Sequence, residues 1–295
     1  MTKYFKVAEH IFSLTMTDNC SLWPRLSQYD PFEVADPGRA QLFGMTLMTE
    51  PFDTSVDRQL VYDAPTEDGQ TVIRLFREAG GGWSFDMSPD KSIECRCHLR
   101  TSEDFSQARL YLDNRRVSDA MFGINNSMML LYAFRSAPLG TLEMHASMTS
   151  NAGKAYLFLA KSGTGKSTHS RQWLETFPGT ELLNDDNPVI RVTADGGVRV
   201  YGTPWSGKTP CYKQLNVPVG AIVRIRQSPE NRATRLNLIE AYASVYSSCS
   251  GLKAERQIAD GLHATLEQVV TTVPCFVLDC RPDHEAAEVC YEAVR

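Results

Sequence analysis

Excess positive charge, long hydrophobic runs and dense cysteine spacing are all missing from this sequence. Its 30 Lys and Arg residues are outnumbered by 35 Asp and Glu residues, which gives a formal net charge of −5. Non-specific binding to nucleic acid depends on basic patches that displace counterions from phosphates, so this balance disfavours a nucleic-acid partner. Hydrophobic residues make up 42% and charged residues 22% of the 295 residues, a composition typical of a globular protein with a sizeable core.

The longest apolar run, residues 128–134, is far shorter than the roughly 20 residues that a membrane-spanning helix needs. We therefore expect no membrane partner. The N-terminal segment carries Lys3, Lys6 and Glu9 among its apolar residues, and so it lacks the uninterrupted apolar core of a secretory signal. These features together predict a cytoplasmic protein.

Eight cysteines in a chain of this length are too sparse for a disulfide scaffold, and we expect reduced thiols. Cys95, Cys97 and His98 stand close together but lack the spaced second pair of ligands that a zinc site would supply. We interpret them as ordinary strand residues.

The N-terminal part of the chain predicts an antiparallel β region followed by a helix. Short strands separated by turn sequences are expected at residues 72–76, 83–87 and 93–97. Apolar residues then recur at helical spacing between residues 120 and 132, which predicts a helix of about 18 residues. We assign residues 1–138 to a β-rich domain that ends in this helix.

From residue 139 onward, strands alternate with helices, and we assign residues 139–295 to a second, α/β domain within a chain that is α+β overall. Residues 155–160 are almost continuously apolar, which predicts a central strand buried on both faces. Further strands are expected at residues 181–184, 188–192, 198–201, 219–225 and 275–279, and helices at residues 166–176, 238–246, 255–270 and 284–294.

The segment Ala160-Lys161-Ser162-Gly163-Thr164-Gly165-Lys166-Ser167 follows that strand and fits the phosphate-binding motif G-x-x-x-x-G-K-[ST], with alanine in place of the first glycine. Inward-pointing backbone N–H groups of such a turn form an anion nest, and the next helix adds its positive dipole end. Lys166 would reach the β- and γ-phosphates of ATP, and the Ser167 hydroxyl would bind Mg²⁺. The residues expected to bind ATP are Ser162, Gly163, Thr164, Gly165, Lys166, Ser167 and Thr168. The alternative is a loop that only caps a helix.

Two adjacent carboxylates, Asp185 and Asp186, end the apolar stretch at residues 182–183. A nucleotide kinase needs one acid to hold Mg²⁺ and one to accept the proton of the acceptor hydroxyl, and a pair at one strand end can do both. Which aspartate takes which role is left open by the sequence. Without the loop upstream, the same residues would be an ordinary surface turn.

Residues 142–147, the loop and residues 182–186 together resemble the C-terminal catalytic domain of HPr kinase/phosphorylase, a member of one P-loop class with the ATP-dependent phosphoenolpyruvate carboxykinases. Residues 202–208 and 217–224 look like the HPr-kinase-like proteins of that class. The resemblance covers roughly residues 140–290. It implies a P-loop core of the HPr-kinase/carboxykinase type, with His145 beside the acidic pair to orient or charge-balance the catalytic aspartate. HPr kinases are typically hexameric, so a homo-oligomer is also implied.

The sequence departs from that family in two respects. HPr kinases carry a glutamate within an arginine-glycine signature after the aspartate pair, whereas residues 202–208 contain no carboxylate. The first 115 residues do not resemble the N-terminal domain of HPr kinase, and HPr is not implied as the substrate. Within residues 202–208 we interpret Trp205, Ser206 and Lys208 as acceptor or phosphate contacts; the alternative is a glycine-bounded hairpin with a packed tryptophan.

The sequence thus predicts an ATP- and Mg²⁺-dependent kinase that transfers the γ-phosphoryl group to a hydroxyl of a protein, peptide or small metabolite. Its catalytic residues would be Lys166, Asp185, Asp186 and His145, and its metal ligands Ser167, Asp185 and Asp186. One alternative is a carboxykinase-like enzyme, although its lysine and histidine metal set before the loop is represented here by His145 alone. Another is an ATP-binding sensory module with little turnover. One arginine among Arg224, Arg226, Arg232 and Arg235 could stabilise the transferred phosphoryl group, and the sequence does not select it.

Overall fold

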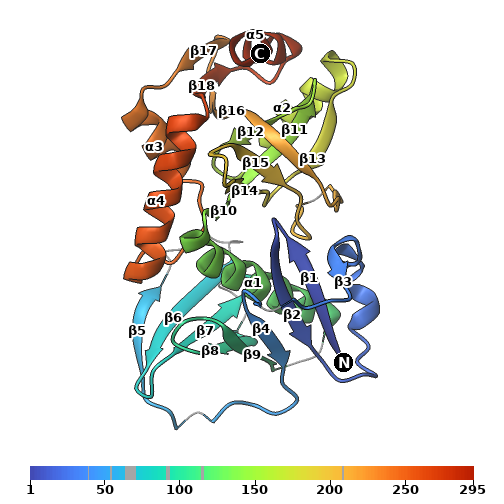
Figure 1. Ribbon diagram of the computed structural model, residues 1–295, viewed down its shortest axis with the longest axis vertical. Helices are drawn as coiled ribbons and strands as arrows, with labels where there is room; N and C mark the ends of the chain where they lie inside the picture. Colours follow the sequence, from blue (N-terminus) through green and yellow to red (C-terminus); the bar gives the residue numbers. More distant parts are fainter. Residues whose placement is uncertain (39, 54, 64–70, 91–93, 114–115, 208) are drawn as a thin grey trace. The chain divides into compact units, whose positions relative to one another are not determined.

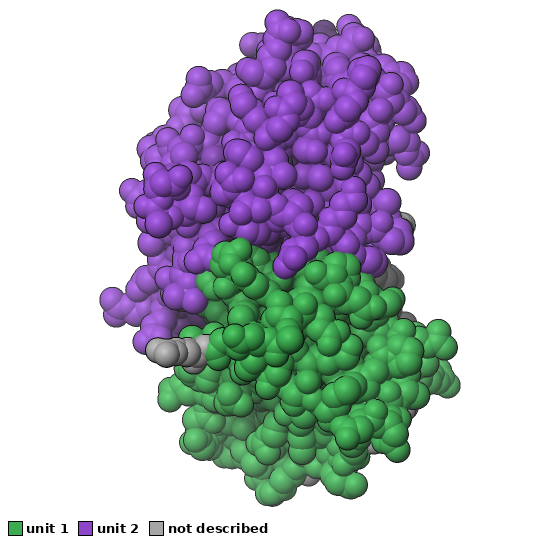
Figure 2. Space-filling model, turned by 45° about the vertical axis from the view of Figure 1, so that its right-hand side comes forward, with its two compact units in different colours: residues 1–135 green, residues 136–295 purple. Residues whose placement is uncertain are grey.

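A computed structural model describes residues 1–38, 40–53, 55–63, 71–90, 94–113, 116–207 and 209–295 (Figure 1). The chain divides into two compact units, Met1–Arg135 and Ser136–Arg295, which are coloured separately in Figure 2. Each unit contains a large mixed sheet with helices, so the fold is mixed α/β, in agreement with the α+β prediction. Within the described ranges, no helix combines the length and the apolar character needed to cross a membrane.

The described part of the first unit forms a nine-stranded sheet with the order β3-β1-β2-β4-β9-β8-β7-β6-β5. The strands are β1 (Thr2–Val7), β2 (His10–Thr15), β3 (Glu33–Val34), β4 (Gly44–Leu47), β5 (Arg58–Asp63), β6 (Val72–Glu78), β7 (Trp83–Ser88), β8 (Cys97–Thr101) and β9 (Gln107–Leu112). Two short 3₁₀ helices, Trp23–Arg25 and Ser27–Phe32, join β2 to β3. The prediction of an antiparallel region is wrong for β4, which runs parallel to both β2 and β9.

The expected strands at residues 72–76 and 83–87 are present as β6 and β7. The expected strand at 93–97 is wrong for residues 94–96, because β8 begins at Cys97, and Ile93 lies outside the described residues. Cys97, Leu99 and Thr101 are buried on one side of β8, and they continue the same alternation as Ile93, Cys95 and Cys97. A period of two shows which side chains share a face, but it does not show where along the chain the pairing begins.

Helix α1 (Val117–Ser136) follows the first sheet, as the helical spacing predicts. Ile124, Met128 and Leu131 are fully buried, so the methionine fills core space. Gly123 lets the helix approach β8 and β9 closely. A Cβ at this position would lie 2.8 Å from Leu112 Cδ2 and 2.9 Å from Cys97 Sγ.

The second unit contains the other sheet, with the order β10-β14-β15-β16-β12-β11-β13 and with β18 and β17 continuing beyond β16. Its strands are β10 (Thr141–Glu143), β11 (Ala146–Asn151), β12 (Lys154–Leu159), β13 (Glu181–Asn184), β14 (Val189–Val192), β15 (Val198–Tyr201), β16 (Asn216–Gln227), β17 (Arg232–Arg235) and β18 (Cys275–Cys280). Its helices are the 3₁₀ turn Ala137–Leu139, α2 (Lys166–Thr176), α3 (Leu238–Tyr246), α4 (Arg256–Thr272) and α5 (His284–Val294).

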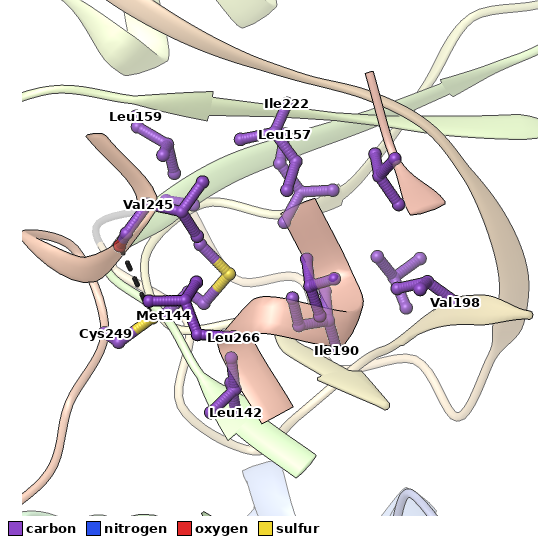
Figure 3. Packing of buried hydrophobic residues seen from close by; sticks show 14 of the residues in the cluster. Leu142, Met144, Leu157, Leu159, Ile190, Val198, Ile222, Val245, Cys249 and Leu266 are labelled. Carbon is purple, nitrogen blue, oxygen red and sulfur yellow. Dashed lines mark hydrogen bonds between the residues drawn. The ribbon is translucent and has the colours of Figure 1, made fainter. Parts of the chain in front are cut away.

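Strand β12 is buried on both faces, as its apolar run predicts. Leu157 and Leu159 belong to one core, with Ile222 of β16 and the inward faces of α3 and α4 (Figure 3). Tyr156 and Phe158 belong to a second core with α2 and α5 on the opposite face. Each fully buried large apolar side chain contributes roughly 1.5–3 kcal/mol. Helices on both faces of β12 therefore hold this strand firmly in the middle of the unit.

Strands β12, β16 and β18 run parallel and adjacent to one another. Their register pairs Leu159 with Arg224 and Gln227 with Cys280, so the strands end at the same edge of the sheet. In open α/β sheets, ligands bind outside the carboxyl ends of parallel strands. This edge is where the candidate site lies.

Candidate functional site

The loop that joins β12 to α2 has open space beside its two glycines, Gly163 and Gly165. Gly163 and Gly165 have φ angles of 77° and 118°, a left-handed conformation that side chains rarely adopt. A Cβ on either glycine would meet no heavy atom within 4 Å. The glycines are therefore required by the backbone path, and the space in front of the loop is free for a ligand.

Helix α2 begins directly after Gly165, its N-cap residue, which has no side chain with which to cap the first turn. In the same unit, Asn237, Glu255 and Asp283 each cap a helix through a side-chain oxygen. The first N–H groups of a helix lack intrahelical partners and attract anions. Of the residues expected to bind ATP, Ser162, Gly163, Ser167 and Thr168 are exposed, Thr164 and Gly165 are half-buried and Lys166 is buried.

The side chains of Lys166, His145 and Asp186 contact one another in that order. The Lys166 ammonium donates to His145 Nε2 at 2.8 Å and to the Ala160 carbonyl at 3.1 Å. Because Nε2 accepts, the neutral ring carries its proton on Nδ1, which lies 3.1 Å from Asp186 Oδ1. Burial lowers the pKa of Lys166, and the charges of Asp186 and Asp185 oppose this effect. Three of the predicted catalytic residues thus converge, although they come from three segments of the chain.

The two aspartates have different surroundings. Asp185 is buried; its Oδ1 accepts from Ser147 Oγ at 2.9 Å and its Oδ2 from Thr209 Oγ1 at 2.9 Å. Ser147 Oγ also lies 2.6 Å from Ser170 Oγ on α2. The Asp186 side chain, in contrast, is 35% exposed. Asp185 is fixed by hydroxyl groups, and Asp186 is the accessible member of the pair.

An asparagine that precedes the pair shapes the turn. Asn184 is fully buried at the end of β13, and its Oδ1 accepts from the backbone N–H groups of Asp186 at 2.9 Å and Asn187 at 3.0 Å. Its Nδ2 donates to Thr203 Oγ1 at 3.1 Å. Sequence reasoning missed this residue, yet an asparagine at a strand end before Asp-Asp-Asn-Pro is the signal of such a side-chain turn.

The segment after β15 packs against this turn. A Cβ at Gly207 would lie 3.1 Å from Asp186 Cβ and 3.2 Å from the Asp185 carbonyl oxygen. Trp205 is buried, and Ser206 Oγ donates to the Thr209 carbonyl at 2.7 Å. Lys208 lies outside the described residues. The role of these three residues as substrate contacts stays a prediction.

Of the four arginines that the sequence does not separate, Arg224 is linked to the candidate site. It pairs in register with Leu159, the last residue of β12, and its positive charge acts on Lys166. Its guanidinium donates to Ser247 Oγ at 2.8 Å and Ser248 Oγ at 2.9 Å. The Ser248 carbonyl in turn accepts from the His145 backbone N–H at 2.8 Å. Arg224 therefore supports the segment that holds His145.

A buried acid lies just before His145. Glu143 is fully buried, and neither carboxylate oxygen has a hydrogen-bond partner among the described residues. Burial raises the pKa of Glu143 to about 7; the charge of Asp186 acts in the same direction and the nearby Ser250 side chain opposes it. Sequence reasoning gave this residue no role.

The predicted metal ligands offer oxygen only: the Ser167 hydroxyl and the carboxylates of Asp185 and Asp186. Hydroxyl and carboxylate oxygens are the ligands that Mg²⁺ prefers. The exposed Ser167 begins the helix beside the open loop. This donor set fits Mg²⁺, and it does not fit a metal that requires sulfur or several imidazoles.

In the described part of the chain, one group of His, Cys, Asp and Glu side chains has its ligand atoms close enough together for a metal, and it lies in the first unit: Asp86, Cys95 and His98. Both oxygens of Asp86 already receive the Arg58 guanidinium, at 3.1 and 2.9 Å. The His98 Nδ1 atom lies 2.9 Å from Asp86 Oδ1, and its Nε2 atom lies 3.1 Å from Asp113 Oδ2. These contacts form an ion-pair network that uses the same atoms a metal would need.

No family model matches the chain, and no curated protein matches it. One solved structure that is similar, the Hpr(Ser) kinase/phosphatase from Coxiella burnetii, has a TM-score of 0.31 and 10% sequence identity, over 52% of this chain and 93% of that chain. A likeness at this level assigns neither a fold family nor an activity.

Proposed function

We propose that the protein is an ATP- and Mg²⁺-dependent phosphotransferase whose second unit is a P-loop core of the HPr-kinase/carboxykinase type. The acceptor would be a hydroxyl, either a serine of a protein or peptide or an alcohol of a small metabolite. The observation that carries the proposal is the line Lys166–His145–Asp186 beside a glycine loop that leads into an uncapped helix. A lysine, a polarised carboxylate and an anion nest in one place are what phosphoryl transfer requires.

The loop and α2 would bind the triphosphate. Their N–H groups and the helix dipole favour a multiply charged anion. Lys166 is held by a neutral imidazole and a carbonyl, so a phosphate oxygen would be a stronger partner for its ammonium than either. Transfer of the Lys166 ammonium from His145 to the phosphates would leave His145 Nε2 free to accept another hydrogen bond.

Asp186 would be the base that accepts the proton of the acceptor hydroxyl, because it is the exposed carboxylate and is oriented by His145 Nδ1–H. Asp185, fixed by Ser147 and Thr209, would hold the metal together with Ser167. Bound Mg²⁺ would neutralise charge on the β- and γ-phosphates. Positioning and charge neutralisation would supply most of the rate acceleration.

The test is incubation of the purified protein with γ-labelled ATP and Mg²⁺, alone and with a host extract separated into protein and small-molecule fractions. We expect label in one fraction, at a rate that Lys166→Ala lowers on the order of 1,000-fold, because the variant loses a charge aimed at the phosphoryl group.

Lys154→Ala is the matched control. Lys154 is an exposed lysine at the opposite end of β12, and its loss should leave the rate unchanged. Equal rates in the Lys166→Ala variant and the parent would contradict the proposal. ATP binding without transfer to either fraction would favour a sensory module instead.

A further inference from the structure

The guanidinium of Arg224 is a half-buried positive charge that only neutral oxygen atoms hold in the described part of the chain. Its Nε atom donates to Ser244 Oγ at 3.1 Å, and its Nη2 atom donates to the Ser244 carbonyl. The same Nη2 atom also donates to Ser247 Oγ at 2.8 Å and to Ser248 Oγ at 2.9 Å. Burial lowers the pKa of Arg224, since a charge withdrawn from water without an opposite charge is costly.

The guanidinium of Arg224 keeps one nitrogen, Nη1, for a further partner. Arginine carries its N–H donors in a planar fork, and the Nη1 atom holds two of them. Nη1 makes no hydrogen bond to any described residue, and it retains solvent-accessible surface. The serines thus fix the fork from one edge and leave a charged donor accessible at the other. Such a donor binds carboxylate and phosphate oxygens more strongly than neutral ones.

Arg224 lies on the side of the second sheet where the acceptor would arrive. Arg224 and Ile222 share one face of β16, because side chains two residues apart along a strand point the same way. Helices α3 and α4 cover this face, and α2, which continues from the glycine loop, covers the opposite one. Ser248, a partner of Arg224, also accepts at its carbonyl from the His145 backbone N–H at 2.8 Å. Arg224 is therefore tied to the segment from which His145 contacts Asp186, the proposed base.

We infer that Arg224 binds an anionic group of the acceptor, an inference that rests on the proposed function. The acceptor is then an alcohol with a carboxylate or a phosphate near the hydroxyl that receives the phosphoryl group. Arg224 Nη1 donates to an oxygen of that anion, while Asp186 accepts the proton of the hydroxyl. A neutral alcohol would leave the guanidinium without an opposite charge, so the site discriminates against it. The loop and Lys166 hold the triphosphate, and Arg224 determines which acceptor is used.

The test uses the full chain saturated with Mg²⁺ and the β,γ-imido analogue of ATP, and calorimetry follows the binding of inorganic sulfate as the anionic probe. The parent should bind sulfate, and Arg224→Gln should weaken this binding at least about 10-fold, because a charge-assisted hydrogen bond is lost. Arg226→Gln is the matched control. Arg226 is an exposed arginine of the same strand that pairs with Asp279 at 3.7 Å, and its loss should leave sulfate binding unchanged. Arg224→Lys keeps a positive charge and should bind sulfate more tightly than Arg224→Gln does.

No sulfate binding to the parent complex, or equal binding in Arg224→Gln, would overturn the inference and leave the nucleotide site in place. Equal loss in Arg224→Lys and Arg224→Gln would also overturn it, since the serine contacts and not the charge would then matter. Thermal melting checks that each variant is folded.

The affinities for ATP and ADP, each with Mg²⁺, separate the acceptor from the nucleotide as the source of the anion. Both affinities should be the same in Arg224→Gln as in the parent. A loss for ATP alone would place the γ-phosphoryl group on Arg224 and overturn the inference. A parent that binds neither nucleotide would overturn the inference and the proposed function together.

Discussion

Each unit of the molecule contains a carboxylate–imidazole pair, and the two pairs differ in what surrounds them. In the first unit, Asp86 Oδ1 and His98 Nδ1 are 2.9 Å apart, and the two residues lie opposite each other on the paired strands β7 and β8. In the second unit, Asp186 Oδ1 and His145 Nδ1 are 3.1 Å apart, and the two residues come from separate turns. Asp86 also binds the Arg58 guanidinium through both oxygens, whereas His145 accepts a hydrogen bond from the Lys166 ammonium.

The comparison shows that the pair itself does not define a catalytic site. The Arg58 guanidinium binds both oxygens of Asp86, so neither oxygen is available to a ligand. The first pair therefore stabilises the sheet. The second pair lies beside an open loop, and its lysine can exchange a neutral partner for an anion. The difference is which groups are still available to a ligand.

Matched substitutions in the two pairs should give opposite outcomes, and within this comparison they should have the largest effect. Asp186→Asn should lower phosphoryl transfer on the order of 100-fold, because the amide cannot accept a proton as a base. Asp86→Asn should leave the rate unchanged and lower the free energy of unfolding by about 1–3 kcal/mol, because Arg58 and His98 lose their charged partner. Rates from γ-labelled ATP and denaturant titrations measure the two effects.

If Asp186→Asn instead lost stability and kept its rate, the second pair would be structural like the first. A loss of rate in Asp86→Asn would show that the two pairs are not independent.

Glu143 extends the comparison to an acid that has no ion-pair partner within the described part of the chain. Its pKa is about 7 in the folded chain against an ordinary value of 4.5. Between these values the unfolded chain releases the proton and the folded chain keeps it, so the stability of the parent falls as the pH rises from 4.5 to 7. Glu143→Gln cannot titrate, and at pH 8 it should be more stable than the parent by up to about 3 kcal/mol.

The gain from Glu143→Gln should disappear near pH 4, where both chains are neutral at this position. Denaturant titrations from pH 4 to 8 test this, with Glu267→Gln on the exposed face of α4 as the control. A gain that does not change with pH would show that the effect comes from packing and not from the charge.

His98 gives the smallest effect. The hydrogen bond to Asp86, helped by Asp113, raises its pKa above the ordinary 6.5 although burial opposes this. The charged ring therefore stabilises the fold below pH 6.5, and this contribution is lost as the pH rises through the folded pKa. His98→Asn should cost no more than about 1 kcal/mol near pH 6, since the side chain is partly exposed, and less at pH 9. Melting curves at the two pH values measure it; a larger cost at pH 9 would contradict the assigned sign.

Local patterns predicted most of the second unit. The apolar run at residues 155–160 indicated a strand buried on both faces, and helix α3 begins where Asn237 and Glu240 form a reciprocal capping box. In the first unit the alternation of the expected strand at 93–97 continues beyond Cys97 into β8, so the alternation alone predicts a strand that begins too early. Pairing across a sheet decides where a strand starts, and that information is not local.

The candidate site was predictable as a set of residues but not as an arrangement. The motif selects Lys166 by its spacing alone, while the contact with His145 depends on how β10 and β11 turn beside the loop. The different surroundings of Asp185 and Asp186 depend on Ser147 and Thr209, which lie far from them in the sequence. Such roles are set by tertiary packing, and no residue pattern in one segment encodes them.

Helix α2 differs from its neighbours because its first residue is preceded by Gly165 and not by a capping side chain. A helix whose first turn lacks a cap frays more readily, so we expect the amide protons there to exchange with solvent faster than those at the capped first turns of α3, α4 and α5. An anion bound on the loop would complete that turn. The ligand would then act as part of the secondary structure, and slower amide exchange at residues 166–169 would report its arrival even before any chemistry takes place.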